Sequence, residues 1–161
     1  MDSKPQKHFL SVLFMALITM AISFSAPAFA KGDIYVTKKG LAIKGYDPVS
    51  YFVDAKAKKG KKKFSHVHAG NTWRFTSAAN KQAFIANPVA YIPQYGGHCA
   101  YAASVLNKVV KVDPRAWKIV NNKLYLNYNK KINRKWLTNL QQNIVTGDAQ
   151  WPALAQKVKT R

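Results

Sequence analysis

The decapeptide YIPQYGGHCA, residues 91–100, contains a double-glycine turn and the only cysteine of the chain. Gly96 and Gly97 permit backbone conformations that other residues rarely adopt, so they allow two segments to approach closely. Cys99 follows this turn directly, beside His98. Thiolate and imidazole are the side-chain groups that soft metals and thiol chemistry use. We therefore expect the fold to be organised around this turn and look there first for a site.

A short helix is predicted immediately after the turn, over residues 98–106. Small and apolar residues recur on it with helical spacing, at Cys99, Ala102, Ala103 and Leu106. On such a helix His98 points about 100° away from Cys99, so the two do not form a catalytic pair. A thiol in the first turn lies near the positive end of the helix dipole, which favours the thiolate. The alternative is that Cys99 is a small buried side chain at a helix interface.

A β-hairpin is predicted before the turn, over residues 64–76, with Gly70-Asn71 as its loop. Pairing outward from that loop places His66 and His68 on one face with aromatic residues. Two histidines in this relation could both reach one metal ion, or they could lie at the aromatic edge of the core. A tetrahedral site would have to combine Cys99 with histidines from His66, His68 and His98.

The remaining local signals predict further helices and a second hairpin. Asp47 and Ser77 are predicted helix caps, the latter for a helix over 78–86 with Phe84 and Ile85 facing inward. Asn121-Asn122 predicts a two-residue hairpin loop that pairs Ile119 with Leu124 and Trp117 with Leu126. A long helix is expected over 129–144, ended by Gly147. Together these elements predict a small single α+β domain, with two β-hairpins or a short antiparallel sheet packed against three to four helices.

Residues 1–30 have the pattern of a secretory signal peptide. Two lysines precede an apolar run from Phe9 to Phe24, and Ala28-Phe29-Ala30 supplies small residues at the positions a signal peptidase requires. The alternative, a retained membrane anchor, needs a longer apolar span. We expect cleavage after Ala30, a periplasmic or secreted protein, a domain over 31–154, a basic tail over 155–161, and no membrane span after cleavage.

The charge of the chain is strongly positive, at +20 with 26 basic and 6 acidic residues. Such a field attracts anions, for example anionic lipid or lipopolysaccharide. The densest run contains six lysines that form a candidate anion-binding patch: Lys56, Lys58, Lys59, Lys61, Lys62 and Lys63. The alternative is a solvated surface loop. Nucleic acid is the least expected partner for an exported protein.

Several spaced motifs together resemble the exported YHS-domain proteins over nearly all of residues 40–154. They are GYDPVSYF (45–52), TWRFTS (72–77), PQYGGHCA (93–100), LYLNYNK (124–130) and AQWP (149–152). The wider YHS and TRASH-like group is associated with heavy-metal handling, and its metal-binding members use several cysteines. The resemblance therefore implies Cys99, and next to it His98, as the candidate ligand positions.

These observations lead to three functional hypotheses. The first is a non-enzymatic exported binding domain that holds a soft metal, copper or zinc, through Cys99, His98, His66 and His68. The second is a cationic domain that binds anionic surfaces, in which Cys99 is structural. The third is a thiol redox protein acting through Cys99, which would need a base or a cation close to the sulfur.

Overall fold

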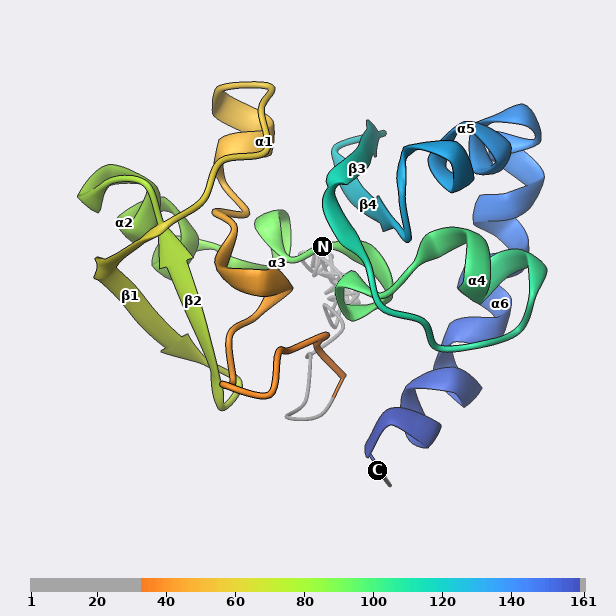
Figure 1. The fold of residues 1–161 in the computed structure, drawn as a ribbon, viewed down its shortest axis with the longest axis horizontal. Helices are drawn as coiled ribbons and strands as arrows, with labels where there is room; N and C mark the ends of the chain where they lie inside the picture. The colour runs from red at the N-terminus through yellow and green to blue at the C-terminus, as the bar shows by residue number, and fades with distance from the viewer. Residues whose placement is uncertain (1–32, 160–161) are drawn as a thin grey trace, which may run out of the picture.

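The computed structural model describes residues 33–159, so the expected leader and its cleavage after Ala30 lie outside the described residues. The described part contains six α-helices and two antiparallel two-stranded sheets, which confirms the α+β class in one small domain (Figure 1). The order of elements is η1 (Ile43–Gly45), α1 (Ser50–Val53), β1 (Lys61–His68), β2 (Asn71–Phe75), α2 (Ala78–Ala86), α3 (Pro88–Tyr91), η2 (Gln94–Gly97), α4 (Ala100–Val105), β3 (Asp113–Val120), β4 (Lys123–Asn127), α5 (Lys130–Thr138) and α6 (Leu140–Lys159).

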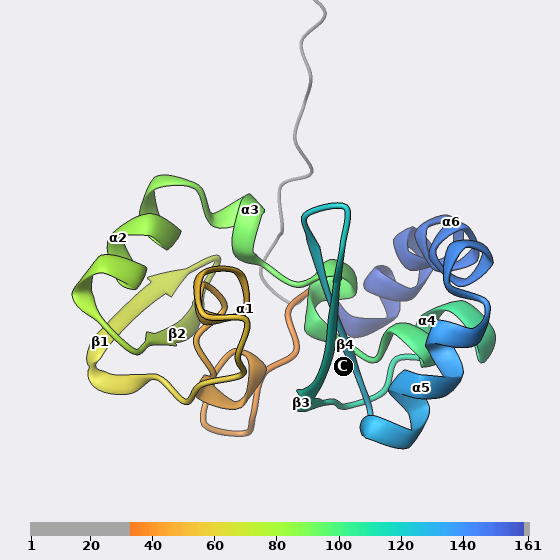
Figure 2. The same cartoon turned by 90° about the horizontal axis from the view of Figure 1, so that it is seen from above.

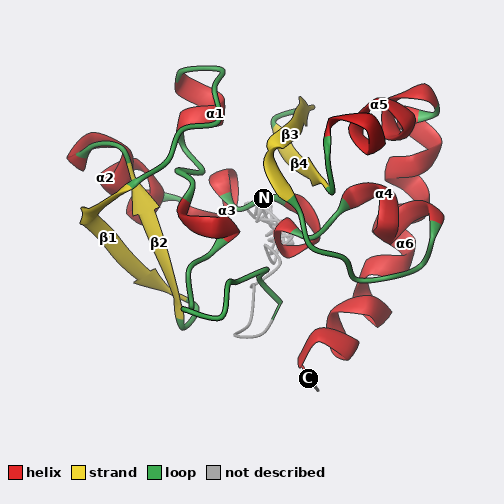
Figure 3. Cartoon of the chain, viewed as in Figure 1, coloured by secondary structure: helices red, strands yellow, loops and turns green. Residues whose placement is uncertain are grey.

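The domain has two halves, each built on one hairpin. The β1–β2 hairpin lies with α1 and α2, whereas the β3–β4 hairpin lies with α4, α5 and α6 (Figures 2 and 3). One buried core nevertheless runs through both halves, because Trp73 and Phe84 belong to the same cluster as Leu124 and Leu126. The Tyr51 hydroxyl also donates to the Pro114 carbonyl at 2.9 Å, which ties α1 to β3.

The double-glycine turn is the place where the first residues of the described chain pack against the backbone of η2. Gly96 and Gly97 have φ of 58° and 78°, in the left-handed region that favours glycine. A Cβ at Gly96 would lie 2.7 Å from the Asp33 carbonyl carbon, and one at Gly97 would lie 2.8 Å from Ile43 Cγ2. The Tyr35 amide donates to the Gly96 carbonyl at 2.8 Å. The turn therefore serves close packing of backbone.

The first hairpin forms, but its loop is Ala69-Gly70, one residue earlier than predicted. His68 pairs with Asn71 and His66 with Trp73. The Asn71 side chain donates to the Ala69 carbonyl at 2.9 Å and stabilises this loop although Ala69 has φ of 49°. Moving the loop centre by one residue changes the partner of each residue by two positions, so the histidines stay on the Trp73 face.

The second hairpin has the predicted register. Asn121 and Asn122 have φ of 48° and 58°, as a type I′ loop requires, and Trp117 pairs with Leu126 and Ile119 with Leu124. The helix after Ser77 is also confirmed, with the Ser77 hydroxyl accepting from the Asn80 amide. The prediction for Ile85 is wrong, since that side chain is exposed and only Phe84 is buried in α2.

Asp47 lies just before α1 and connects it to α2, but the N-cap of α1 is Val49 and not Asp47 as predicted. Asp47 Oδ1 accepts from the Val49 amide at 2.9 Å. Its Oδ2 accepts from the Thr76 amide and hydroxyl at 2.8 and 2.7 Å and from the Asn80 side chain at 2.7 Å. Asp47 is fully buried, so this carboxylate is a structural group of the core.

The C-terminal helices differ from the prediction. The helix expected over 129–144 breaks at Asn139, and Asn143 donates its side-chain amide to the Trp136 carbonyl at 2.7 Å across the break. Gly147 lies inside α6, where a Cβ would lie 2.8 Å from Tyr95 Cζ. The expected basic tail from 155 continues as helix to Lys159, because Leu154 and Ala155 are buried.

Candidate functional site

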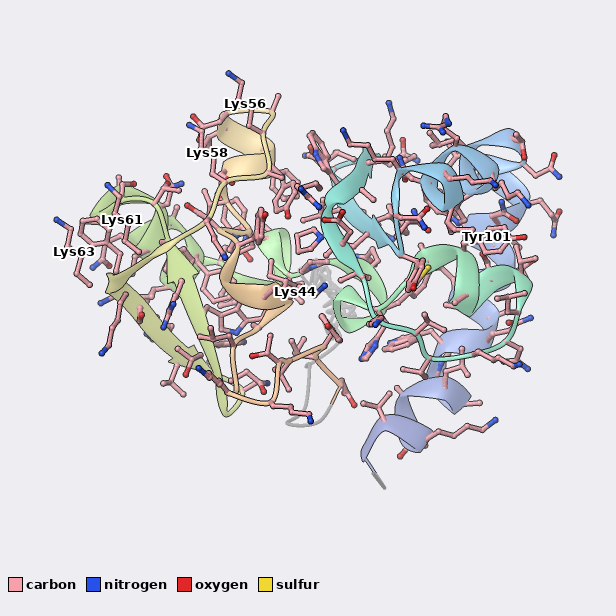
Figure 4. The ribbon with its side chains drawn as sticks, in the orientation of Figure 1. Lys44, Lys56, Lys58, Lys61, Lys63 and Tyr101 are labelled. Atoms are coloured by element: carbon pink, nitrogen blue, oxygen red, sulfur yellow. The ribbon has the colours of Figure 1, made fainter. Side chains whose placement is uncertain are left out.

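A basic cleft of about 460 Å³ lies between the two halves of the domain. Lys44 and Tyr46 line it from the η1 segment, and Lys59 lines it from the chain that leads into β1. The opposite wall is formed at and around the start of β3, by Lys111, Asp113 and Arg115, together with Tyr128 and Asn129 after β4. Figure 4 shows Lys44 in the space between the halves.

The backbone that presents Lys44 has an uncommon conformation. Ile43, Lys44 and Gly45 have φ of 40°, 57° and 74°, all left-handed. For a buried β-branched residue such as Ile43 this is a strained conformation, of a kind that persists only where surrounding structure enforces it. The Gly60 amide donates to the Gly45 carbonyl at 2.9 Å and fixes the segment against the chain that carries Lys59. Two cationic side chains are thus held on one wall by backbone contacts.

The carboxylate that lines the cleft is already neutralised by an adjacent arginine. Arg115 donates from Nε to Asp113 Oδ1 and from Nη2 to Oδ2, both at 3.0 Å. This side-chain hydrogen bonding is the main reason that the pKa of Asp113 is lowered, and Lys44 also contributes. Lys44, Lys59 and Lys111 form no ion pair with any residue of the described part. The net charge along the cleft is therefore positive.

The predicted lysine patch is exposed, and its lysines do not converge on one site. Lys56, Lys58, Lys61 and Lys63 follow the outer edge of α1 and β1 in Figure 4. Lys58 forms an ion pair with Asp54 at 3.0 Å. Of the six lysines of the patch, Lys59 alone lines the cleft. The sequence reasoning missed Lys44, Lys111 and Arg115, because no pattern along the chain brings these three segments together.

His66 and His68 lie at the aromatic edge of the first half. His66 is opposite Trp73 in the hairpin, and the His68 ring contacts the Phe84 ring edge-on at a centroid distance of 5.6 Å. Burial lowers the pKa of His66, and proximity to His68 lowers it further. The two histidines thus lie at the aromatic edge of the core, which is the alternative to metal binding that the sequence left open.

His98 lies in the core of the second half and not on a helix. Its ring contacts Tyr35 and Trp151 at centroid distances of 5.5 and 5.7 Å. Neither ring nitrogen of His98 makes a well-formed hydrogen bond. The nearby Val110 backbone and the Asp33 charge favour the protonated imidazole and act to raise the pKa of His98. Burial dominates and lowers the pKa of His98 to about 4.

Cys99 immediately precedes α4 and is 1% exposed. Its Sγ accepts from the Tyr128 amide at 3.2 Å and lies 3.7 Å from Asn127 Oδ1. Burial raises the pKa of the thiol, although nearby backbone N–H groups oppose the rise. The expectation that a helix start favours the thiolate is wrong, because desolvation outweighs the backbone contribution.

The four candidate metal ligands do not form one site. Among residues 33–159, no three His, Cys, Asp or Glu side chains are grouped closely enough to hold a metal ion. His66 lies opposite Trp73 and His68 against Phe84, whereas His98 lies against Trp151 and Cys99 against Tyr128. The structure therefore does not bring Cys99 and these histidines together in the one copper or zinc site that the sequence predicted. The side chains belong to separate packing environments.

No protein-family model, curated protein or solved structure matches this chain. Between residues 33 and 159, no helix combines the length and apolarity needed to cross a bilayer.

Proposed function

We propose that this chain is an exported, non-enzymatic binding domain of YHS-like type, and that its ligand is an anion held in the basic cleft. The observation that carries the proposal is the convergence of Lys44, Lys59 and Lys111, from three separate segments, on one concave surface. Asp113, the carboxylate of this surface, is already paired with Arg115. A concave site lined by one sign of charge concentrates the field and attracts ions of the opposite sign.

The chemistry of the lining suits phosphate or carboxylate. Lysine ammonium groups bind such anions as compact point charges, and each carries three N–H donors. Tyr46, Tyr128 and Asn129 also line the cleft and can donate hydrogen bonds from hydroxyl and amide groups. Anionic lipid headgroups and lipopolysaccharide offer these anions outside the cytoplasm, whereas nucleic acid is the least favoured source.

The geometry does not favour the other two hypotheses. A soft-metal site needs ligands that converge, and Cys99 lies among apolar side chains with Asn127 and Tyr128 as its polar neighbours. A thiol redox role needs an accessible thiol with a lowered pKa, whereas the Cys99 thiol is 1% exposed and its pKa is raised.

The resemblance to exported YHS-domain proteins supports the proposed fold type more than the proposed ligand. Asp47, one of the residues that carry the resemblance, holds α1 to α2 by accepting a 2.7 Å hydrogen bond from the Asn80 side chain. Gly96 and Gly97 serve backbone packing. These residues have structural roles in this chain, so the ligand is proposed from the cleft alone.

Export is proposed from the pattern of residues 1–30. Expression of the full gene in a bacterial host and mass determination of the product tests it. A mature protein that begins at Lys31 supports export with cleavage after Ala30. An uncleaved product confined to the cytoplasm contradicts it.

The anion site is tested by titrating the purified chain with inorganic phosphate while following backbone amide shifts by NMR. We expect saturable shifts at Lys44, Lys111 and Tyr128, and an affinity that falls by roughly tenfold between about 20 and 200 mM salt. Shifts spread over the Lys61–Lys63 edge without saturation would contradict a defined site. A parallel titration with Zn(II) and Cu(I) that shows stoichiometric binding lost in Cys99→Ala would favour the metal hypothesis instead.

A further inference from the structure

An apolar groove of about 200 Å³ lies between α4 and α5 in the second half. Leu106, Val110 and Ile132 line it together with Tyr101 and Tyr128, and its exposed lining is apolar. Figure 4 shows Tyr101 in the space between these helices. Cys99 also lines the groove and is the most deeply buried of these residues, whereas Leu106 is 49% and Tyr128 42% exposed at its rim. The groove therefore opens to solvent at Leu106 and Tyr128, with the buried Cys99 and Ala102 in its lining.

The apolar groove and the basic cleft share one wall. Tyr128 lines both of them. The consecutive residues Val110 and Lys111 also divide between the two, since Val110 lines the groove and Lys111 lines the cleft. The cationic surface and the apolar surface are therefore adjacent at Tyr128.

The size of the groove indicates that it holds only part of a ligand. At about 200 Å³ it lies below the range of roughly 300–1,000 Å³ that is typical of sites for whole small molecules. The surface that it exposes is apolar, which suits an alkyl segment. The adjoining cleft of about 460 Å³ offers cationic side chains, which suit a charged headgroup and not an alkyl segment.

We propose that the ligand is a single-chain anionic amphiphile of the fatty-acid class. Its carboxylate is held by Lys44, Lys59 and Lys111, and its alkyl chain crosses Tyr128 into the groove beside Leu106. This inference rests on the proposed anion site and adds the chemical class of its ligand. A single alkyl chain matches the small volume of this groove.

The test compares binding of butanoate and dodecanoate to the purified chain, with dodecanoate below its micelle concentration. We expect dodecanoate to bind roughly tenfold or more tightly than butanoate, because burial of apolar surface favours the longer chain. Leu106→Gln should weaken dodecanoate binding roughly fivefold and leave butanoate binding unchanged. Val105→Gln is the matched control, because Val105 is 47% exposed next to Leu106 and does not line the groove.

The outcomes separate this inference from the anion site on which it rests. If butanoate and phosphate bind but chain length or Leu106→Gln has no effect, the amphiphile inference is overturned and the anion site stands. If dodecanoate binding depends on Leu106 but is unchanged in Lys111→Gln, the anion site is overturned, and with it the proposed headgroup position. Loss of affinity in both variants, with Val105→Gln equal to wild type, supports both.

Discussion

Arg115 holds Asp113 through two hydrogen bonds of 3.0 Å and so neutralises the carboxylate that lines the basic cleft. Because this hydrogen bonding lowers the pKa of Asp113, the pair persists at neutral pH. The charges of Lys44, Lys59 and Lys111 are thereby left without a carboxylate partner among the described residues. The pair therefore leaves the cleft with a net positive charge.

Asp113→Asn should strengthen anion binding. The substitution frees the Arg115 guanidinium and adds one unit of positive charge to the cleft, so we expect phosphate affinity to rise roughly two- to fivefold at low salt. Asp54→Asn is the control, because it makes the same charge change at an exposed ion pair with Lys58 outside the cleft. Calorimetric titration of both variants checks the prediction, and an equal rise in both would show that only net charge matters.

Asp47→Asn should destabilise the fold. An amide cannot accept at both oxygen positions, so the Thr76 amide, the Thr76 hydroxyl and the Asn80 side chain would lose their shared acceptor. We expect a loss of about 2–4 kcal/mol in the free energy of unfolding, measured by urea denaturation. The exposed Asp54→Asn should cost less than about 1 kcal/mol. A near-neutral Asp47→Asn would refute the structural role given to this carboxylate.

His98 should make the fold less stable in mild acid. Its pKa is lowered to about 4 by burial, so the unfolded chain binds more protons below pH 6.5. Stability is therefore highest above the unfolded pKa and falls as pH decreases toward 4. We expect a loss of about 2 kcal/mol between pH 7 and 5 from this residue alone. Urea unfolding at several pH values should show a shallower fall in His98→Phe, and identical slopes would contradict the assignment.

Gly147→Ala should weaken the packing of α6 on Tyr95, contrary to the usual stabilising effect of this substitution in a helix. Alanine normally stabilises a helix by about 1 kcal/mol relative to glycine. Here its Cβ would meet the Tyr95 ring, whose hydroxyl donates to Asp148 at 3.0 Å. We expect a net loss of about 1–3 kcal/mol, partly relieved when Tyr95→Phe is added. A stabilised single variant would show that Tyr95 moves aside without cost.

Local signals in the sequence predicted the local structure well. Asn121-Asn122 correctly predicted the loop and register of the second hairpin, and Ser77 the start of α2. Each of these signals acts on backbone groups only a few residues away in the sequence. The first hairpin shifted its loop by one residue, because the Asn71 side chain stabilises a loop that contains Ala69. Gly147 was mistaken for a helix end because its contact with Tyr95 spans about fifty residues of sequence.

The candidate site was harder to predict, because it depends on which distant segments meet. The run from Lys56 to Lys63 is conspicuous in the sequence, yet only Lys59 lines the cleft. Lys44 and Lys111 are isolated lysines that line the same cleft from distant segments of the chain. For Cys99, its position at a helix start predicted a lowered pKa of the thiol. The pKa is raised instead, because desolvation by burial outweighs the effect of the nearby backbone N–H groups.

The proposed anion site depends on the position of the lysines and not on their number. The most direct measurement compares phosphate affinity in two triple variants of equal charge change. Lys44→Gln, Lys59→Gln and Lys111→Gln together remove cations from the cleft, whereas Lys61→Gln, Lys62→Gln and Lys63→Gln remove them from the exposed start of β1. We predict a loss of roughly tenfold or more in the first variant and less than about twofold in the second at the same low salt. Equal losses in both variants would show that only the number of lysines matters and that the cleft is not a defined anion site.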